Sequence, residues 1–522
     1  MNCDYPNDTL VKMTEETETT RYYKSQMDNL SENSYPHKFV SDYPRITLKE
    51  FHEKYDYFEP EQFDNTIMYS LWGRTHTQRN CGKHIIFMDL NNDDQKLQVM
   101  VWDQHYYDQE AFKTLSKISR GYIIGIEGYP YKTKQGELSI RAIKIEVLTP
   151  CLHQIPKKLN QKSGSTPLNS DELMAFFGFS DKEKRFRERY LDLVINEQSF
   201  KVFKTRSRLI TFIRCFLDKK DFMEIETPIL NMIPSGANAS PFKTHHNDLN
   251  TDMFLRIAPE LALKMAVVGG FNKVYELGRV FRNEGIDRTH NPEFTSIELY
   301  QADADYNTLI SLNEELLQEL AMYLHGKTQV KYQDQTIDFA GPYPRIDIMD
   351  FLTNKFPNFP NINSSTLGSE LLDFCINNQV SLPAVLSSST LLDKIIGHFI
   401  EPLCQNPTFI CGHPIIMSPL AKPDRFRPGL TERFELFVMG REISNGFTEL
   451  NDPRIQRKNF EEQQAQKDAG NDEAHGMDEN FVKALEIGLP PTAGLGIGID
   501  RLVMLMTNQN DIRDVIMFPT MK

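Results

Sequence analysis

The segment FRNEG places an arginine and a glutamate two positions apart, at Arg282 and Glu284. On a strand, two such side chains point to the same face. A guanidinium there can hold a phosphate bidentately, while the carboxylate accepts a hydrogen bond from an exocyclic amine. The following segment, THNPEF, adds the polar His290 and Asn291 and the ring of Phe294 for base stacking. Together they indicate a nucleotide site, whereas Arg282 and Glu284 alone could form a solvated surface ion pair.

Two glutamates lie in a second polar segment, RFELFVMGREISNG. Its alternating apolar residues predict a strand, and the Met-Gly pair that follows can reverse the chain. In such a hairpin, Glu435 and Glu442 face each other across the ladder. Two carboxylates without basic partners are costly to hold close, and carboxylate oxygens select Mg²⁺ bound with nucleotide phosphates. The sequence therefore predicts a Mg²⁺ site, and the alternative is two exposed glutamates on opposite faces.

Alternating glycines mark a third segment, TAGLGIGIDR. Gly494, Gly496 and Gly498 leave one face of a strand bare, so a flat ring can lie against the backbone. Asp500 is expected to be the N-cap of the next helix, which Arg501 enters with its side chain near that face. A Rossmann phosphate loop is the alternative for any GxG pattern, but the third glycine is misplaced for it.

The elements that position these residues fall into domains. Five short runs of β-branched and aromatic residues lie between residues 66 and 150, with a helix expected at about 108–116. They predict a small closed barrel of the oligonucleotide-binding kind. A polar flexible leader (residues 1–45) precedes this barrel domain (46–150), and a linker containing Pro and Gly (151–185) follows it.

The remainder of the chain, residues 186–522, is predicted to be a mixed α+β domain with a central antiparallel sheet flanked by helices. Apolar residues at helical spacing predict a helical segment over residues 182–221. Residues from about 343 to 430 are rich in Pro, Asn and Ser and are expected to be an insertion. The three polar segments described above all lie in this domain.

Charge and cysteine content restrict the class of protein. The 522 residues include 58 Lys and Arg against 72 Asp and Glu, a net charge of −14, which by itself disfavours nucleic-acid binding. Residues 66–150, however, hold 11 Lys and Arg against 9 Asp and Glu. Seven scattered cysteines without a CxxC pair argue against a disulfide framework. With no signal peptide and no apolar membrane span, a cytoplasmic location is expected.

The three segments follow EIETP, which ends at Pro228. Their order and residues resemble the motifs of the class II aminoacyl-tRNA synthetases. The preceding barrel resembles the anticodon-binding OB-fold domain of one subgroup. Within that subgroup, FRNEGIDRTHNPEFTSIELY and SGANASPFKTHHNDL are similar to lysyl-tRNA synthetases rather than to the aspartyl and asparaginyl enzymes. The resemblance covers roughly residues 45–522.

The resemblance implies roles for individual positions. Carboxylates at Glu298 and Glu449 suit an ammonium side chain, with Tyr300 and Asn445 as neutral partners. The implied lysine site consists of Gly236, Glu260, Glu298, Tyr300, Asn445 and Glu449. The implied ATP site consists of Arg282, Asn283, Glu284, His290, Asn291, Phe294, Glu435, Leu436, Gly498, Ile499, Asp500 and Arg501. Arg282 and Arg501 are the implied catalytic residues, and Glu435 and Glu442 the Mg²⁺ ligands.

The resemblance also implies a two-step reaction. ATP activates L-lysine to lysyl-adenylate with release of pyrophosphate, and lysine then passes to the 3′ end of tRNA(Lys). Phe87 and Gln98, eleven positions apart, would stack on the central anticodon base and hydrogen-bond to it. The alternative is that Phe87 is an ordinary buried residue of the barrel. A homodimer is expected, with no membrane association. The alternative functions are a synthetase-like enzyme that lysylates a protein and a non-catalytic regulatory protein.

Overall fold

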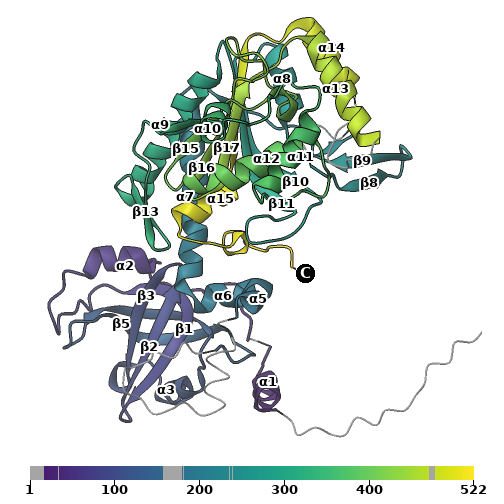
Figure 1. Cartoon of the computed structure of the whole chain (residues 1–522). Helices are drawn as coiled ribbons and strands as arrows, with labels where there is room; N and C mark the ends of the chain where they lie inside the picture. Colours follow the sequence, from purple (N-terminus) through teal and green to yellow (C-terminus); the bar gives the residue numbers. More distant parts are fainter. Residues whose placement is uncertain are drawn as a thin grey trace, which may run out of the picture. The chain divides into compact units, whose positions relative to one another are not determined.

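The computed structural model describes residues 17–32, 34–156, 179, 181–233, 236–237, 239–468 and 477–521. The chain divides into two compact units, Met1–Phe200 and Lys201–Lys522. Each unit is described by itself (Figure 1). Leader residues 1–16 and linker residues 157–178 lie outside the described residues.

A closed five-stranded barrel forms the first unit, in the order β1-β2-β3-β5-β4. The strands are β1 (Tyr69–Cys81), β2 (Ile85–Asn92), β3 (Gln95–Trp102), β4 (Ile123–Lys132) and β5 (Leu138–Thr149). Alternate residues such as Met88, Val99 and Ile140 point inward and are fully buried. This alternation is the one expected of strands with one face on the core, and the predicted barrel is confirmed.

The described residues of the first unit also form the helices α1 (Glu18–Asp28), α2 (Leu48–Tyr55), α3 (Gln109–Thr114), α5 (Lys182–Arg187) and α6 (Arg189–Ile195). Helix α3 is the one expected before the fourth strand, and the Asp108 side chain caps it by accepting from two backbone N–H groups. Helix α1 lies within the segment expected to be a polar leader. Between α1 and α2, Phe39 is buried.

The segment predicted to be helical, residues 182–221, consists of three helices: α5, α6 and α7 (Glu197–Asp218). The breaks fall at Glu188 and Asn196. They surround the buried Asp192 carboxylate, which accepts hydrogen bonds from Arg185, Arg189 and Asn196. The segment is helical as the apolar periodicity indicates, but it is divided into three helices around this buried polar cluster.

An eight-stranded sheet organises the second unit, in the order β14-β15-β16-β17-β18-β11-β10-β6. Its strands are β6 (Met223–Glu224), β10 (Lys273–Phe281), β11 (Glu293–Ala302), β14 (Arg345–Asp347), β15 (Thr408–Cys411), β16 (Arg433–Val438), β17 (Arg441–Thr448) and β18 (Thr492–Gly498). The six central strands are antiparallel, as predicted. The two edge strands, β6 and β14, pair in parallel with their neighbours.

The remaining elements surround this sheet (Figure 1). The helices are α8 (Glu260–Val268), α9 (Tyr306–His325), α10 (Ile348–Lys355), α11 (Leu367–Asn377), α12 (Ser388–Phe399), α13 (Pro453–Asp468), α14 (Glu479–Gly488) and α15 (Ile499–Met506). Small sheets are formed by β7 (Leu230–Asn231), β8 (Lys243–His246) and β9 (Thr251–Leu255), and by β12 (Gln329–Tyr332) and β13 (Gln335–Asp338). None of the helices within the described residues could cross a membrane.

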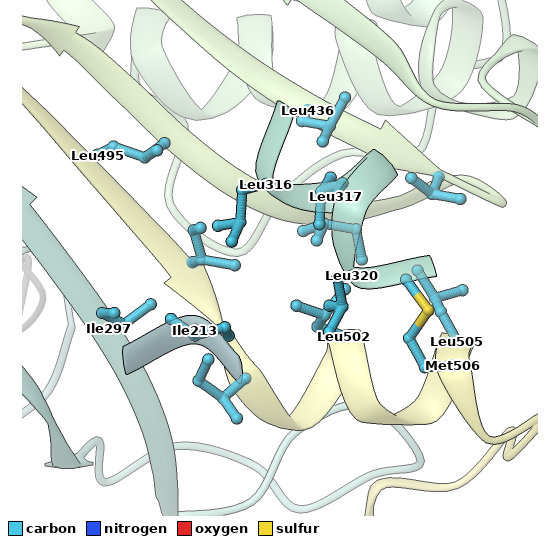
Figure 2. Close-up of a cluster of buried hydrophobic side chains, with 14 of the residues drawn as sticks. Ile213, Ile297, Leu316, Leu317, Leu320, Leu436, Leu495, Leu502, Leu505 and Met506 are labelled. Carbon is cyan, nitrogen blue, oxygen red and sulfur yellow. The ribbon is translucent and has the colours of Figure 1, made fainter. Parts of the chain in front are cut away.

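One face of the sheet is apolar and carries the core. Helices α7, α9 and α15 contribute residues such as Ile213, Leu317 and Leu502, which pack with Ile297 and Leu495 of the sheet (Figure 2). Because side chains alternate along a strand, the neighbours of these sheet residues point to the other face. Those neighbours include glutamates of β11 and glycines of β18, so the same alternation that builds the core exposes a polar face.

Candidate active site

A cavity of about 440 Å³ lies over the polar face of the eight-stranded sheet. Most of the residues expected in the nucleotide and amino-acid sites line it: Gly236, Glu260, Arg282, Glu284, His290, Asn291, Phe294, Glu298, Tyr300, Glu435, Glu442, Asn445, Gly498, Asp500 and Arg501. They come from segments far apart in the sequence, and the antiparallel pairing of β10, β11, β16, β17 and β18 brings them together.

Four other residues expected at the site are placed differently. The side chains of Leu436 and Ile499 are fully buried in the apolar core. Asn283 is exposed, and its backbone N–H donates to the Ser240 carbonyl. Glu449 is buried and lies against the bare face of Gly494, where a Cβ atom would meet its carboxylate.

Arg282 follows the end of β10 and reaches into the cavity. Its Cζ atom lies 5.2 Å from the centroid of the Phe294 ring. Its Nε atom is buried with no hydrogen-bond partner in the described part of the chain. A guanidinium that is held by a ring and still has unused donors is suited to an anionic ligand, because Arg donates in a planar fork that matches phosphate oxygens.

Arg501, in the first turn of α15, lies between two other predicted residues. Its Nη1 atom donates to the Glu442 carbonyl at 2.8 Å, and its Nη2 atom lies 3.1 Å from His290 Nε2. The other ring nitrogen of His290 is 2.9 Å from an Asp287 carboxylate oxygen. Although burial opposes it, hydrogen bonds from Thr289 and His290 lower the pKa of Asp287. This chain of contacts fixes one wall of the cavity.

The prediction that Asp500 caps α15 is wrong. The N-cap position is Gly498, and Asp500 lies in the first turn. Its carboxylate accepts from the Thr295 backbone N–H and from Arg206 of α7, both at 2.6 Å. Asp500 therefore joins three elements beneath the cavity, a role that depends on tertiary contacts rather than on local helix geometry.

Glu435 has the basic partners that the sequence prediction assumed to be missing. Its carboxylate pairs with Arg433 Nη2 at 2.5 Å and with the buried His413 Nε2 at 3.3 Å. Burial alone would raise the pKa of Glu435, but the charge of Arg433, followed by the interaction with His413, outweighs burial and lowers the pKa to about 2. Glu435 is therefore ionised at neutral pH. His413 and Arg433 are functional-site candidates that the sequence interpretation missed.

The predicted face-to-face pairing of Glu435 with Glu442 is also wrong. Met439 and Gly440 form the expected two-residue turn, both with positive φ. A register shift after Leu436 then pairs Glu435 with Asn445, and Phe437 with Glu442. The two carboxylates still line the same cavity. Burial, followed by the charge of Glu435, raises the pKa of Glu442.

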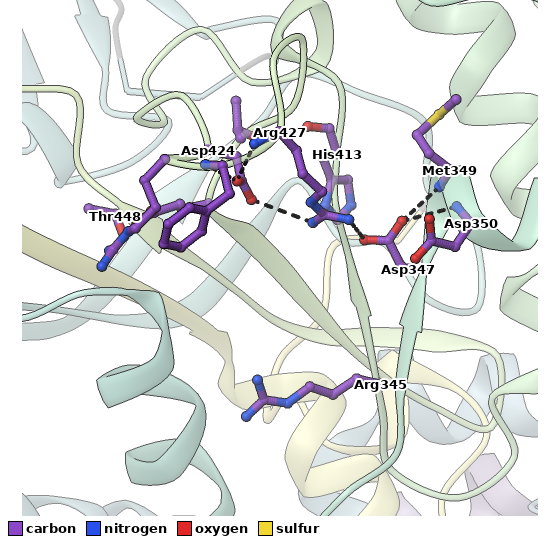
Figure 3. Close-up of polar contacts among 12 residues, drawn as sticks. Arg345, Asp347, Met349, Asp350, His413, Asp424, Arg427 and Thr448 are labelled. Carbon is purple, nitrogen blue, oxygen red and sulfur yellow. Dashed lines mark hydrogen bonds and ion pairs between the residues drawn. The ribbon is translucent and has the colours of Figure 1, made fainter.

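A loop between β15 and β16 holds His413 beside Glu435. Figure 3 shows Arg427 of this loop reaching from Asp424 to Asp347, which caps α10. Asp347 also accepts from the backbone N–H groups of Met349 and Asp350. The loop is therefore fastened to the N-terminus of α10.

The acidic end of the cavity is largely buried: Glu260, Tyr300 and Glu449 are buried, and Glu298 is half-buried. The Tyr300 hydroxyl donates to the Glu298 carboxylate at 3.1 Å. Burial, and then the charge of Glu260, raises the pKa of Glu298 to about 8. Gly494 lies against Tyr300 and Glu449. The sequence predicted that a flat ring lies against the bare glycine face of β18. At Gly494, this face is instead covered by the side chains of Tyr300 and Glu449.

A buried lysine, Lys264, lies between two of these acids. It follows Glu260 by one turn of α8, and its Nζ atom is 2.5 Å from a Glu260 oxygen and also pairs with Glu449. Its side chain is fully buried. Burial alone would lower the pKa of Lys264, but the two carboxylates raise it. The i,i+4 spacing of Glu260 and Lys264 could have indicated their ion pair from the sequence. No sequence pattern indicates the contact between Lys264 and Glu449.

Within the described residues there is no group of three or more His, Cys, Asp or Glu side chains arranged to hold a metal ion. Glu435 and Glu442 are two carboxylates on one cavity wall, and the pKa of Glu442 is raised partly by the charge of Glu435. A divalent cation that brings further ligands of its own, such as nucleotide phosphates, fits this pair.

In the barrel, Phe87 and Gln98 lie on the paired strands β2 and β3, where Phe87 is opposite Met100 and Gln98 is opposite Asp89. Neither side chain belongs to the buried core, and both alternate with inward-facing residues. The alternative of a buried barrel Phe is therefore wrong. The Gln98 Oε1 atom accepts from the Ser139 hydroxyl at 2.9 Å.

Comparison with known proteins identifies the class. Residues 181–522 match the family described as tRNA synthetases class II (D, K and N), and residues 69–148 match the OB-fold nucleic acid binding domain. The chain belongs to this family of class II tRNA synthetases and carries the OB-fold domain at its N-terminal side. The confirmed α+β fold and barrel agree with both matches.

Relatives of known name are lysine–tRNA ligases. The lysine–tRNA ligase of Deinococcus radiodurans is 45% identical over 465 residues, which cover 89% of this chain and 84% of the relative. The lysine–tRNA ligase of Shouchella clausii is 42% identical over 464 residues, covering 89% and 88%. A probable cytoplasmic lysine–tRNA ligase of Vairimorpha ceranae is 41% identical over 521 residues, covering 96% of each chain.

Proposed function

We propose that this protein is a lysine–tRNA ligase. The observation that carries the proposal is the charge of the amino-acid end of the cavity. Glu260 and Glu298 line this end, and the buried Lys264 connects Glu260 to a third carboxylate, that of the buried Glu449. Burial raises the pKa of Glu298 to about 8 and also raises that of Glu449, so bound cations favour the ionised forms of these acids. With all of them ionised, three negative charges and one positive charge leave a net of minus two. The two ammonium groups of L-lysine balance this charge, whereas aspartate or asparagine would not.

The proposed first step joins lysine to AMP. The lysine carboxylate attacks the α-phosphorus of ATP, an oxygen–phosphorus bond forms, and pyrophosphate leaves with the electrons of the broken bond. No base is needed because the carboxylate is already ionised, so catalysis consists of positioning and charge stabilisation. Arg282 would hold the α-phosphate while Glu284 accepts from the adenine amine. Phe294 and Arg501 would enclose the ring.

The remaining assignments follow from the same cavity. Glu435 and Glu442 would hold Mg²⁺, which when bound neutralises phosphate charge. His290 and Asn291 would contact the triphosphate, and Gly498 would leave room for the nucleotide. In the second step the 3′-terminal ribose hydroxyl of tRNA(Lys) attacks the lysyl carbonyl, and AMP leaves.

We also propose that the protein is a cytoplasmic homodimer. Around Pro228, five apolar side chains are exposed in the single chain: Met223, Ile229, Leu230, Met232 and Ile233. Several large apolar side chains exposed within one short segment are typical of a subunit interface. Relatives from Vairimorpha ceranae and Encephalitozoon cuniculi carry the word cytoplasmic in their names. Analytical ultracentrifugation would detect the dimer.

The proposed function is tested by amino-acid-dependent exchange of pyrophosphate into ATP, followed by charging of tRNA, with each amino acid in turn. Exchange and charging with lysine alone are expected. Exchange without charging of tRNA, but with transfer of lysine to a protein, would support a protein-lysylating enzyme. Absence of exchange with every amino acid would favour a non-catalytic protein.

The replacement Gly494→Ala is expected to weaken lysine binding selectively. The new Cβ atom would lie 2.8 Å from Tyr300 Cδ1 and would also meet the Glu449 carboxylate. Both side chains must move, and overpacking of this kind costs about 1–3 kcal/mol, so the KM for lysine should rise roughly tenfold or more. The KM for ATP should not change. Gly397→Ala in α12, where a Cβ meets only ordinary contacts, is the matched control.

Lysine binding is expected to strengthen as the pH rises towards 8. The pKa of Glu298 is raised to about 8, and its ionised form is the one that attracts an ammonium group. Below this pKa, binding of lysine must expel a proton, so the KM for lysine should fall by up to about tenfold per pH unit and level off above it. Steady-state exchange at several pH values measures this. Glu298→Gln should raise the KM and abolish the slope, and an unchanged slope in this variant would contradict the assignment.

A further inference from the structure

One row of residues crosses the polar face of the eight-stranded sheet and connects the two ends of the cavity. Glu435 of β16 is opposite Asn445 of β17. Gly496 of β18 is opposite Asn445 on one side and Glu298 of β11 on the other. Directly paired residues project from the same face of a sheet, and all four line the cavity. Because Gly496 has no side chain, the cavity floor between Asn445 and Glu298 is open.

This row fixes where the carboxylate of a bound lysine lies. Neighbouring strands are about 4.8 Å apart, so Asn445 and Glu298, two strands apart, are separated by about 10 Å, which an extended lysine molecule can bridge. In the proposed site, Glu298 attracts the side-chain ammonium, and the reacting carboxylate must face the phosphates near Glu435. Asn445 lies between these two acids and is therefore the residue of the row beside the carboxylate.

Arg433 decides which atom of the Asn445 amide is available to a ligand. Its Nε atom donates to Asn445 Oδ1 at 3.0 Å. A guanidinium has only donors, so the amide atom that faces it must be the oxygen. The Asn445 Nδ2 atom has no hydrogen-bond partner among the described residues, and it is not one of their buried, unpartnered polar atoms. This nitrogen is therefore open to the cavity that Asn445 lines.

The other nitrogens of Arg433 are already engaged within the protein. Its Nη1 atom donates to the Met417 carbonyl at 2.8 Å and to the Ser418 hydroxyl at 2.9 Å. Its Nη2 atom donates to the Glu435 carboxylate. These contacts, which lie on three different segments of the chain, hold the guanidinium plane in one orientation. Arg433 therefore acts on a ligand through Asn445 rather than by direct contact.

We propose that Arg433 is a positioning residue of the amino-acid site, which fixes the Asn445 amide so that its N–H groups face the carboxylate of lysine. This inference rests on the proposed function. An amide N–H group donates to a carboxylate, whereas an ammonium group needs an acceptor, and the acceptor of this amide faces Arg433. Arg433 thereby makes the site selective for a substrate that carries a carboxylate beside its amino group.

The variant Arg433→Lys tests the inference, because it keeps the charge but loses the planar fork of donors. Isothermal titration calorimetry without ATP would measure the Kd for lysine and for lysinol, in which a CH2OH group replaces the carboxylate. Loss of a fixed hydrogen bond to a charged group should raise the Kd for lysine roughly tenfold or more. The Kd for lysinol should change by less than about twofold, which is within the usual effect of a remote surface replacement.

Arg441→Lys is the matched control and should change neither Kd. Arg441 lies on β17, donates to the Tyr332 hydroxyl and does not belong to the residues that line the cavity. A merely structural role of Arg433 predicts a different result from selective positioning. If Arg433→Lys weakens lysine and lysinol equally, or leaves the Kd for lysine unchanged, the inference is overturned.

A double-mutant cycle with Asn445→Ala supplies the second test. Asn445→Ala alone should raise the Kd for lysine as Arg433→Lys does. Addition of Arg433→Lys to this variant should then change the Kd by less than about twofold, because both replacements remove the same contact. Fully additive effects would contradict the inference. If the wild type binds no lysine, the proposed function fails and the inference fails with it, whereas lysine binding by the wild type with additive variants overturns the inference alone.

Discussion

Arg282→Ala is expected to lose lysine-dependent pyrophosphate exchange by at least about 10²- to 10³-fold, the usual effect of removing one donor that stabilises transition-state charge. Arg282 is the cationic group at the centre of the cavity whose donors are not satisfied by a carboxylate: its Nε atom is buried and unpartnered among the described residues. The Phe294 ring, 5.2 Å from Cζ, holds it in position. Charge that develops on the α-phosphate would then have no fixed partner in the variant.

The matched control is Arg279→Ala, on β10, the strand that Arg282 follows. Arg279 is exposed, and its Nε atom lies 3.7 Å from a Glu293 oxygen, which is a weak surface pair. Exchange by this variant should stay near the wild-type rate, and the melting temperatures of both variants should stay close to that of the wild type. Exchange by Arg282→Ala within tenfold of the wild-type rate would show that Arg282 does not bind the reacting phosphate.

Lys264→Met is expected to lower stability and lysine affinity together. Lys264 is fully buried between Glu260 and Glu449, and removal of one member of a buried ion pair usually costs about 3–5 kcal/mol. Without this ammonium, the closely placed acids cannot all remain ionised. A neutral Glu449 would no longer attract the side-chain ammonium of lysine. The KM for lysine should rise by roughly tenfold or more, while the KM for ATP stays constant.

Two measurements separate this effect from simple loss of folding. Chemical denaturation gives the change in the free energy of unfolding, and exchange kinetics on the folded fraction give the KM for lysine. Lys273→Met is the control, since Lys273 donates to the Lys220 carbonyl and lies over the Phe222 ring, away from the acids. If folded Lys264→Met has the wild-type KM for lysine, Lys264 contributes to stability alone.

Much of the site could be predicted because its residues lie in short segments whose alternation fixes which way they point. Glu298 and Tyr300 alternate with Ile297 and Leu299, which are buried in the core. Once β11 is recognised as a strand, its polar residues must share the opposite face. The same reasoning does not hold for Arg282 and Glu284, because β10 ends at Phe281 and the predicted strand does not reach them, although both line the cavity.

The structure departs from the local pattern where a buried charge gathers its partners. Asp500 has the sequence context of a helix cap, yet its carboxylate bonds to Arg206 and to the Thr295 backbone. The segment from 182 to 221 is helical as its periodicity indicates, but it is divided around Asp192, which gathers three donors. In both places a buried charge gains more from several fixed donors than the local structure loses.

The sequence by itself determined the two-domain organisation, the barrel, the antiparallel centre of the sheet and the polar segments that line one cavity. These depend on period-two alternation and on turn residues, which act within a few positions of the chain. The tertiary structure alone decided which polar side chains meet: Lys264 with Glu449, His413 with Glu435, and Arg206 with Asp500. Ion pairing depends on distances of a few ångströms between side chains remote in sequence, and only the completed fold sets those distances.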